Sequence, residues 1–87
     1  MPDITWTKEA QDMFEKVITA LPQFHRSIAQ KLVKESAEEI TKSRGLAAVE
    51  EKELVEAFFQ EIPPAFKEMM KRLFHKLSID YTKYIKE

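Results

Sequence analysis

Three glutamates in one segment are the first residues whose types and spacing could do chemistry. Glu35, Glu38 and Glu39 stand three and four residues apart, which on a helix brings carboxylates close enough to share a proton. Acid–base catalysis also needs a cleft that moves the pKa values of two such groups apart. We place these glutamates on or near the polar face of a helix, where solvated carboxylates are the rule. The sequence therefore predicts no catalytic residue and no enzyme.

Metal and redox chemistry find little support in the composition. The 87 residues include no cysteine, which removes disulfides, thiolate metal sites and iron–sulfur ligation together. The two histidines, His25 and His75, occur in no His-x-x-x-His or Glu-x-x-His spacing. His25 could be a ligand or a proton shuttle, but an interfacial side chain with one bonded nitrogen is the favoured interpretation. We predict no metal site and no cofactor.

Two groups of residues are candidates for binding a protein partner. One is a histidine–arginine pair at the start of a long predicted helix, and the other is a methionine pair followed by two basic residues. Methionine-rich stripes adapt to partner helices, although the core is their more frequent place. The candidates are His25, Arg26, Met69, Met70, Lys71 and Arg72. We expect the partner to be another protein or a second copy of this chain.

The composition favours helices, because the chain has one glycine and 33% of its residues are charged. We predict an all-α fold, a small bundle of a short helix, a long central helix, a short helix and one or two C-terminal helices. In this prediction residues 1–62 form a three-helix domain. Residues 63–87 form a C-terminal helical extension packed on it, so that the chain is a single globular unit.

The long helix between Pro22 and Gly45 organises the other elements. Its apolar residues spread over roughly 180° of the helix surface, which is wider than the stripe of a helix covered on one side. They are Phe24, Ile28, Ala29, Leu32, Val33, Ala37 and Ile40. We therefore expect contacts on two sides. The sequence leaves open whether neighbouring helices or a second molecule cover the whole arc.

The ends of the predicted helices carry sequence signals. Thr7 can cap the first helix, and Trp6 before it can pack onto that helix. Pro22 fits the first position of the long helix, and Gly45 fits the left-handed position that closes it. A third helix follows at roughly 51–61, with its acidic start suited to a helix N-terminus.

Two stretches between helices are marked less clearly. Residues 46–49 read as a short connector. Near residue 64 a fourth helix begins, and 78–80 is a weak break because Ile79 falls on the wrong face. The last helix either reaches about residue 86 or stops near 77 and is followed by a short helix.

The charge is uneven along the chain although the net charge is −1. Residues 45–62 hold five glutamates and one lysine, and residues 63–87 hold six basic and three acidic side chains. An acidic helix beside a basic one is the favoured interpretation. The first residues have no basic or apolar segment typical of a signal peptide, and no stretch is apolar enough to span a membrane. We expect a cytoplasmic protein with no membrane partner.

A set of residues from Trp6 to Phe58 matches a known pattern. In order it reads Trp6-Thr7, Ala10, Pro22-x-Phe24-x-Arg26, Glu35-x-Ala37, Gly45, Val49, Leu54 and Ala57. It resembles the small C-terminal domain of the B subunit of light-independent protochlorophyllide reductase, here as a short stand-alone protein. The stretch from Ala10 to Pro22 is longer than in that family by about one helical turn. Residues 63–87 lie outside the pattern.

The resemblance implies a non-catalytic accessory or interaction domain. In the full enzyme, ring reduction and iron–sulfur ligation belong to the large catalytic part, so no catalytic residue carries over. The resemblance implies structural roles for Trp6 as a core anchor, Pro22 as a helix start and Phe24 in packing. Arg26 is the matching residue that could also contact a partner.

Two further hypotheses belong to other functional classes. Val49-x-x-x-Glu53-Leu54-x-x-Ala57, after a short and a long helix, is similar to the second half of a histone fold, whose chains pair as dimers. That alternative would bind nucleic acid through the basic last helix, with Lys67, Lys71, Arg72 and Lys76. Neutralising phosphates needs many basic residues, so the net charge of −1 argues against it and we expect no nucleic-acid partner. The other hypothesis is porphyrin binding near His25 or Met69 and Met70.

Overall fold

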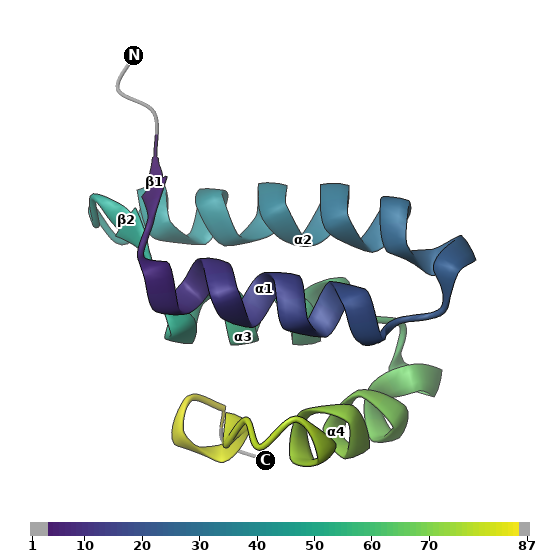
Figure 1. The fold of residues 1–87 in the computed structure, drawn as a ribbon. Helices are drawn as coiled ribbons and strands as arrows, with labels where there is room; N and C mark the ends of the chain where they lie inside the picture. Colours follow the sequence, from purple (N-terminus) through teal and green to yellow (C-terminus); the bar gives the residue numbers. More distant parts are fainter. Residues whose placement is uncertain (1–3, 86–87) are drawn as a thin grey trace.

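The structure is a computed structural model, and it describes residues 4–85 apart from the side chain of Phe24. Its elements are β1 (Thr5–Trp6), α1 (Lys8–Ala20), α2 (Gln23–Ser43), β2 (Ala48–Val49), α3 (Glu51–Glu61) and α4 (Lys67–Lys76). Short 3₁₀ turns at Pro64–Phe66 and Tyr81–Lys83 flank α4. The predicted all-α bundle is confirmed. The helices stack in layers, with α2 on one side, α1 and α3 in the middle and α4 on the other side (Figure 1).

The start of α1 follows the predicted signal. The Ala10 N–H donates to the Thr7 hydroxyl at 3.1 Å, so Thr7 caps the helix. The buried stripe of α1 is made by Ala10, Met13, Phe14, Val17 and Ile18. Pro22 takes the cap position of α2 rather than its first helical position, and α2 begins one residue later, at Gln23.

α2 ends in a Schellman motif, in which a residue with positive φ turns the chain back over the last turn. Gly45 has φ +69°, and the N–H of Leu46 donates to the Thr41 carbonyl at 3.1 Å. The predicted left-handed role of Gly45 is confirmed.

α4 ends in the same motif, but with serine in place of glycine. Ser78 has φ +61°, and the N–H of Ile79 donates to the Phe74 carbonyl at 2.8 Å. This turn returns Ile79 to the core, against which it packs half-buried, whereas a continued helix would have placed it on the wrong face. The predicted break at 78–80 is therefore confirmed, and so is the shorter alternative for the last helix, with a short helical turn after it.

Gly45→Ala and Ser78→Gly should change stability in opposite directions. No atom lies within 4 Å of a Cβ added at Gly45, so alanine there costs only its left-handed backbone, roughly 1 kcal/mol. Glycine at position 78 removes that cost and gains freedom in the unfolded chain, which leaves a stabilisation of about 0.5 kcal/mol. Urea unfolding followed by circular dichroism measures both changes. If both substitutions change the free energy of unfolding in the same direction, the prediction is wrong.

The stretch 46–49 is more than a connector. β1 and β2 form a parallel ladder with Thr5 opposite Ala48 and Trp6 opposite Val49. The Thr7 N–H extends it by donating to the Val49 carbonyl at 3.0 Å. This pairing fixes the entry into α1 against the exit from α2.

Trp6 fastens the ladder to two helices. Its ring centroid lies 5.2 Å from that of Phe14 in α1, and its indole N–H donates to the Glu38 carboxylate of α2 at 2.9 Å. Glu38 is half-buried, so its prediction as a solvated carboxylate was wrong, while Glu35 and Glu39 are exposed. The packing predicted for Phe24 concerns a side chain outside the described part of the chain.

The C-terminal segment completes the core. Met70 and Phe74 of α4 are 2% and 0% exposed. The Phe74 ring centroid lies 5.7 Å from that of Phe58 in α3 and 6.1 Å from that of Tyr81 in the turn after α4. α4 and the turn after it therefore pack on α3 through shared aromatic contacts.

Polar contacts add to this packing. The Lys16 ammonium of α1 donates to the Leu77 carbonyl after α4 at 3.4 Å. Burial raises the pKa of the Tyr84 hydroxyl, and the negative charges of Glu51 and Asp80 raise it further. The segment after α4 thus lies against both α1 and the start of α3.

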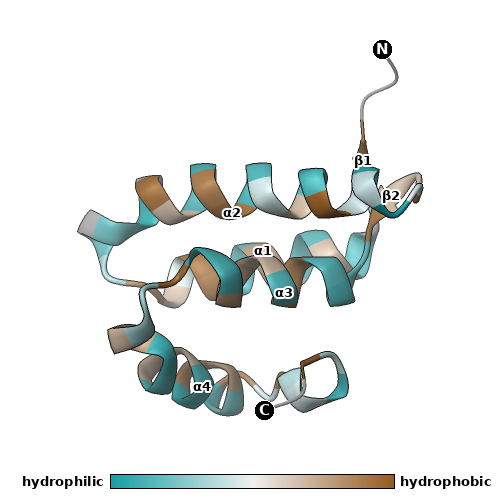
Figure 2. Cartoon of the chain, turned by 180° about the vertical axis from the view of Figure 1, so that it is seen from behind, coloured by the Kyte–Doolittle hydropathy of each residue, from teal (hydrophilic) through white to brown (hydrophobic). Residues whose placement is uncertain are grey.

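The apolar arc of α2 is covered only in part. Val33 and Ala37 are buried at 1% and 0% exposure, and α3 packs along α2 here. Ile28 and Leu32 on the adjoining face are 61% and 41% exposed. Seen from behind, hydrophobic and hydrophilic residues alternate along α2 (Figure 2). The expectation of cover on two sides is therefore only partly met within one chain.

Within residues 4–85, no helix combines the length and the apolar character needed to cross a lipid bilayer.

Candidate functional site

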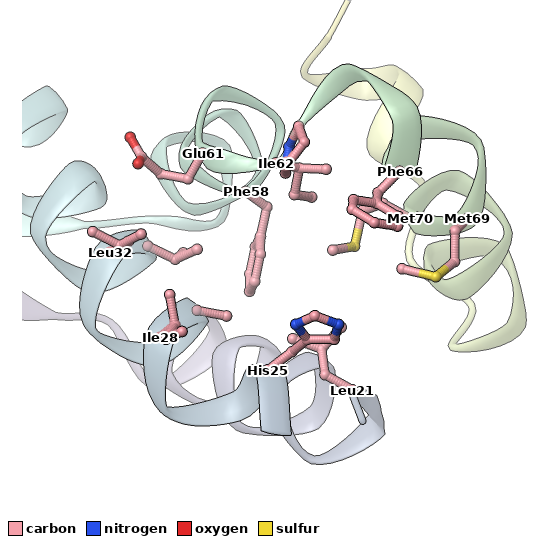
Figure 3. Close-up of a pocket in the computed structure, with 13 residues that line it drawn as sticks. Leu21, His25, Ile28, Leu32, Phe58, Glu61, Ile62, Phe66, Met69 and Met70 are labelled. Carbon is pink, nitrogen blue, oxygen red and sulfur yellow. The ribbon is translucent and has the colours of Figure 1, made fainter. Parts of the chain in front are cut away.

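An apolar groove runs between the first half of α2 and the segment that joins α3 to α4 (Figure 3). His25, Ile28 and Leu32 of α2 form one wall. Phe66 and Met69, from the 3₁₀ turn and the start of α4, are on the opposite side, and the groove has a volume of about 260 Å³. Pro63 and Pro64 turn the chain between α3 and α4 and so set the distance between the two walls.

Buried side chains lie between the two walls. Phe58 of α3 projects between the walls, and Met70 of α4 lies beside it (Figure 3). Both belong to the hydrophobic core, with exposures of 0% and 2%. Glu61 is the acidic residue at the rim, and its carboxylate points away from Phe58 (Figure 3). The groove is therefore an opening onto the core itself.

Among the described residues, most of the large apolar side chains that are exposed to solvent lie at this groove. Ile28 and Leu32 are 61% and 41% exposed, and Phe66 and Met69 are 44% and 43% exposed. Leu46, at 37%, lies elsewhere, in the turn after α2. Single exposed apolar residues need no explanation, but four around one concave site make this groove the candidate binding surface.

The structure brings three of the six predicted partner-binding residues together. His25, Met69 and Met70 all line the groove, and the His25 ring centroid lies 6.4 Å from that of Phe66 across it. Met69 faces the opening, whereas Met70 is part of the core. The volume lies below the roughly 300–1,000 Å³ of pockets that enclose small molecules, which argues against porphyrin binding at these residues.

Arg26 has a structural task. Its guanidinium donates to the Leu21 carbonyl at 2.9 Å and to the Thr19 carbonyl at 2.8 Å. These are backbone oxygens at the end of α1 that have no partner within that helix. Arg26 therefore holds the corner between α1 and α2, which places His25 at the end of the groove.

Lys71 and Arg72 are on a different side of α4. They border a shallow hollow with His75 and Asp80 and do not line the groove. Lys71 forms an ion pair with Glu68 at 3.3 Å, and Arg72 is exposed. The predicted basic surface and the apolar groove are therefore two separate features of α4.

One charged cluster was not anticipated from the sequence. Arg44, at the end of α2, contacts Glu53 at 3.1 Å and Glu56 at 2.6 Å in α3. Desolvation opposes the charge of Arg44, but hydrogen bonds and attraction from Glu56 and Glu53 outweigh it and raise its pKa. Glu53 also accepts from the Glu50 N–H at 3.2 Å, which completes a capping box for α3. The cluster joins α2 to α3, and we assign it a structural role.

Among residues 4–85, no three His, Asp or Glu side chains are close enough together to hold a metal ion. Glu35 and Glu39 are exposed on α2 without a cleft. The feature with the clearest binding geometry is the groove.

The sequence profile of one protein family matches residues 3–87, so the whole groove lies within the match. The chain belongs to the DUF2621 family. The description of this family is that of a protein of unknown function. No curated protein and no solved structure matches the chain. The role of the groove in this DUF2621 domain is therefore inferred from the geometry of the groove itself.

Sequence reasoning identified some groove residues but not the groove. The methionine pair and His25 were noted for their types, while Ile28 and Leu32 were counted only as part of a wide arc. Their exposure depends on how far Pro63 and Pro64 carry α4 from α2, which is a matter of tertiary packing. The arc wider than one neighbour can cover was the signal that pointed toward this surface.

Proposed function

We propose that the protein is a non-catalytic interaction domain that binds an amphipathic helix of a protein partner in the groove. The observation that carries the proposal is the gathering of four exposed apolar side chains around one opening onto the core. Grooves between helices recognise a partner helix through apolar side chains spaced by about one turn.

The dimensions of the groove fit such a partner. Ile28 and Leu32 stand one helical turn apart on the α2 wall, which matches the repeat of a second helix lying alongside. Met69 on the opposite wall has a flexible side chain that can follow the shape of an incoming residue. Glu61 at the rim offers a carboxylate to a lysine or arginine on the edge of the partner helix.

The interpretation as an accessory domain agrees with this proposal. The likeness to the C-terminal domain of the protochlorophyllide reductase B subunit implies a domain that works by contact and performs no chemistry. That likeness stays a prediction from the sequence. The nucleic-acid alternative would use Lys71 and Arg72, which lie apart from the groove, and Lys71 is already engaged with Glu68.

Photo-crosslinking in native lysate tests the proposal. The benzophenone amino acid p-benzoylphenylalanine replaces Met69 at the groove in one variant and Lys52, an exposed residue of α3 outside it, in the control. We expect a discrete adduct from position 69, weak or no adduct from position 52, and loss of the adduct when Leu32→Lys is added. Equal labelling from both positions, or an adduct that survives Leu32→Lys, would refute binding in the groove.

A further inference from the structure

We propose that the groove is occupied by α2 of a second copy of the chain, with the two α2 helices antiparallel. This inference rests on the proposed function and names the partner. It starts from four exposed residues of α2, His25, Ile28, Leu32 and Glu35, which we call the α2 stripe. The first three form the α2 wall of the groove, and Glu35 continues the same row toward the C-terminal end of the helix.

The spacing of the α2 stripe reads the same in both directions. Its members are separated by three, four and three residues. When two copies lie antiparallel about a point midway between Ile28 and Leu32, each Ile28 faces Leu32 of the other copy. By the same geometry each His25 faces Glu35 of the other copy. Steps of three and four residues are those with which two helices pack along a shared seam.

The side chains of the α2 stripe also fit one another chemically. Two apolar pairs, Ile28 with Leu32, lie at the centre, where water is most fully excluded. At each end an imidazole N–H of His25 can donate to the carboxylate of Glu35. A parallel arrangement would instead set His25 beside His25 and Glu35 beside Glu35, which separates each imidazole from the carboxylate and places two like charges together. The pattern therefore selects the antiparallel direction.

A second copy uses the rest of the groove as well. A helix on the α2 stripe lies beside the opposite wall, where Phe66 and Met69 are 44% and 43% exposed. Two-fold symmetry repeats this contact on the other copy, so both sets of exposed apolar residues are covered by one isologous interface. This contact would complete the cover of the α2 arc that one chain leaves partly open.

Cross-linking tests the direction of the pair, and the absence of native cysteine makes it specific. Ile28→Cys and Leu32→Cys are prepared as separate variants that differ in mass through a tag, mixed in equal amounts and treated with a short bismaleimide. We expect the mixed 28–32 product to exceed both like-with-like products together several-fold. Like-with-like products in excess would overturn the antiparallel arrangement.

Sedimentation equilibrium of the purified protein tests the pair itself. We expect a monomer–dimer equilibrium in which His25→Glu weakens dimerisation about tenfold by placing two carboxylates face to face. The exchanged variant His25→Glu with Glu35→His restores it, and Lys34→Glu, on the exposed far side of α2, leaves it unchanged. A failure of the exchanged variant to recover would overturn the proposed pairing.

The outcomes also separate this inference from the proposed function. A purified protein that stays monomeric, with a groove-dependent adduct to a different protein in lysate, refutes the second copy and leaves the interaction domain in place. A monomer without any groove-dependent adduct refutes both.

Discussion

Phe74→Ala is expected to lower the free energy of unfolding by about 3–5 kcal/mol. Phe74 is 0% exposed, and its ring contacts Phe58 at 5.7 Å, Phe59 at 5.5 Å and Tyr81 at 6.1 Å between centroids. Alanine leaves a cavity where α4 meets α3 and removes these ring contacts together. Small domains have a total stability of only about 5 kcal/mol or somewhat more, so a large share of the molecules would unfold.

Two control variants show whether burial causes this loss. Phe74→Leu keeps most of the volume and should cost less than about 1.5 kcal/mol. Phe66→Ala makes the same chemical change at a residue that is 44% exposed and should cost less than about 1 kcal/mol. Guanidinium unfolding measures all three. A loss below about 1 kcal/mol for Phe74→Ala would mean that α4 is not part of the cooperative core.

Arg44→Met is expected to lower the free energy of unfolding by about 2 kcal/mol. The Glu53 side chain is 4% exposed, and the substitution removes its contact to Arg44 at 3.1 Å. Glu53 then keeps only the bond from the Glu50 N–H. The cost stays below that of a fully buried pair, because the Arg44 side chain is 40% exposed and water screens its charge.

A double-mutant cycle separates the ion pair from other effects of the substitution. Glu53→Gln keeps the shape of the capping residue and removes its charge, so Arg44→Met with Glu53→Gln should cost about 1 kcal/mol less than the two single changes added together. Arg72→Met, at an exposed arginine of α4, is the matched control and should change stability by less than about 0.5 kcal/mol. Strict additivity of the two single changes would refute the coupling.

The helices could be predicted because their ends are encoded locally. Thr7 accepts the bond that starts α1, Pro22 stands directly before α2, and Gly45 closes it with a positive φ. Each of these signals acts within a few residues, so a sequence shows it directly. The stretch at 78–80 was harder, because Ser78 adopts the left-handed conformation that glycine usually signals.

Features that depend on distant residues could not be predicted in the same way. The β1–β2 ladder pairs Thr5 with Ala48, and strands of two residues have no periodicity to detect. Glu38 was assigned to water because its partner, Trp6, lies in a different element. The groove also depends on contacts between distant residues, because the exposure of Ile28 and Leu32 is set by the position of α4 relative to α2.

The contact between Trp6 and Glu38 has a spectroscopic consequence. Trp6 is the single tryptophan of the chain, and it lies beside the second half of α2, whereas the groove lies along the first half. Unfolding exchanges its carboxylate partner and the Phe14 ring for water, so its emission spectrum follows the opening of the end where β1, α1 and α2 meet. The protein thus carries an intrinsic fluorophore that distinguishes loss of the fold from occupation of the groove.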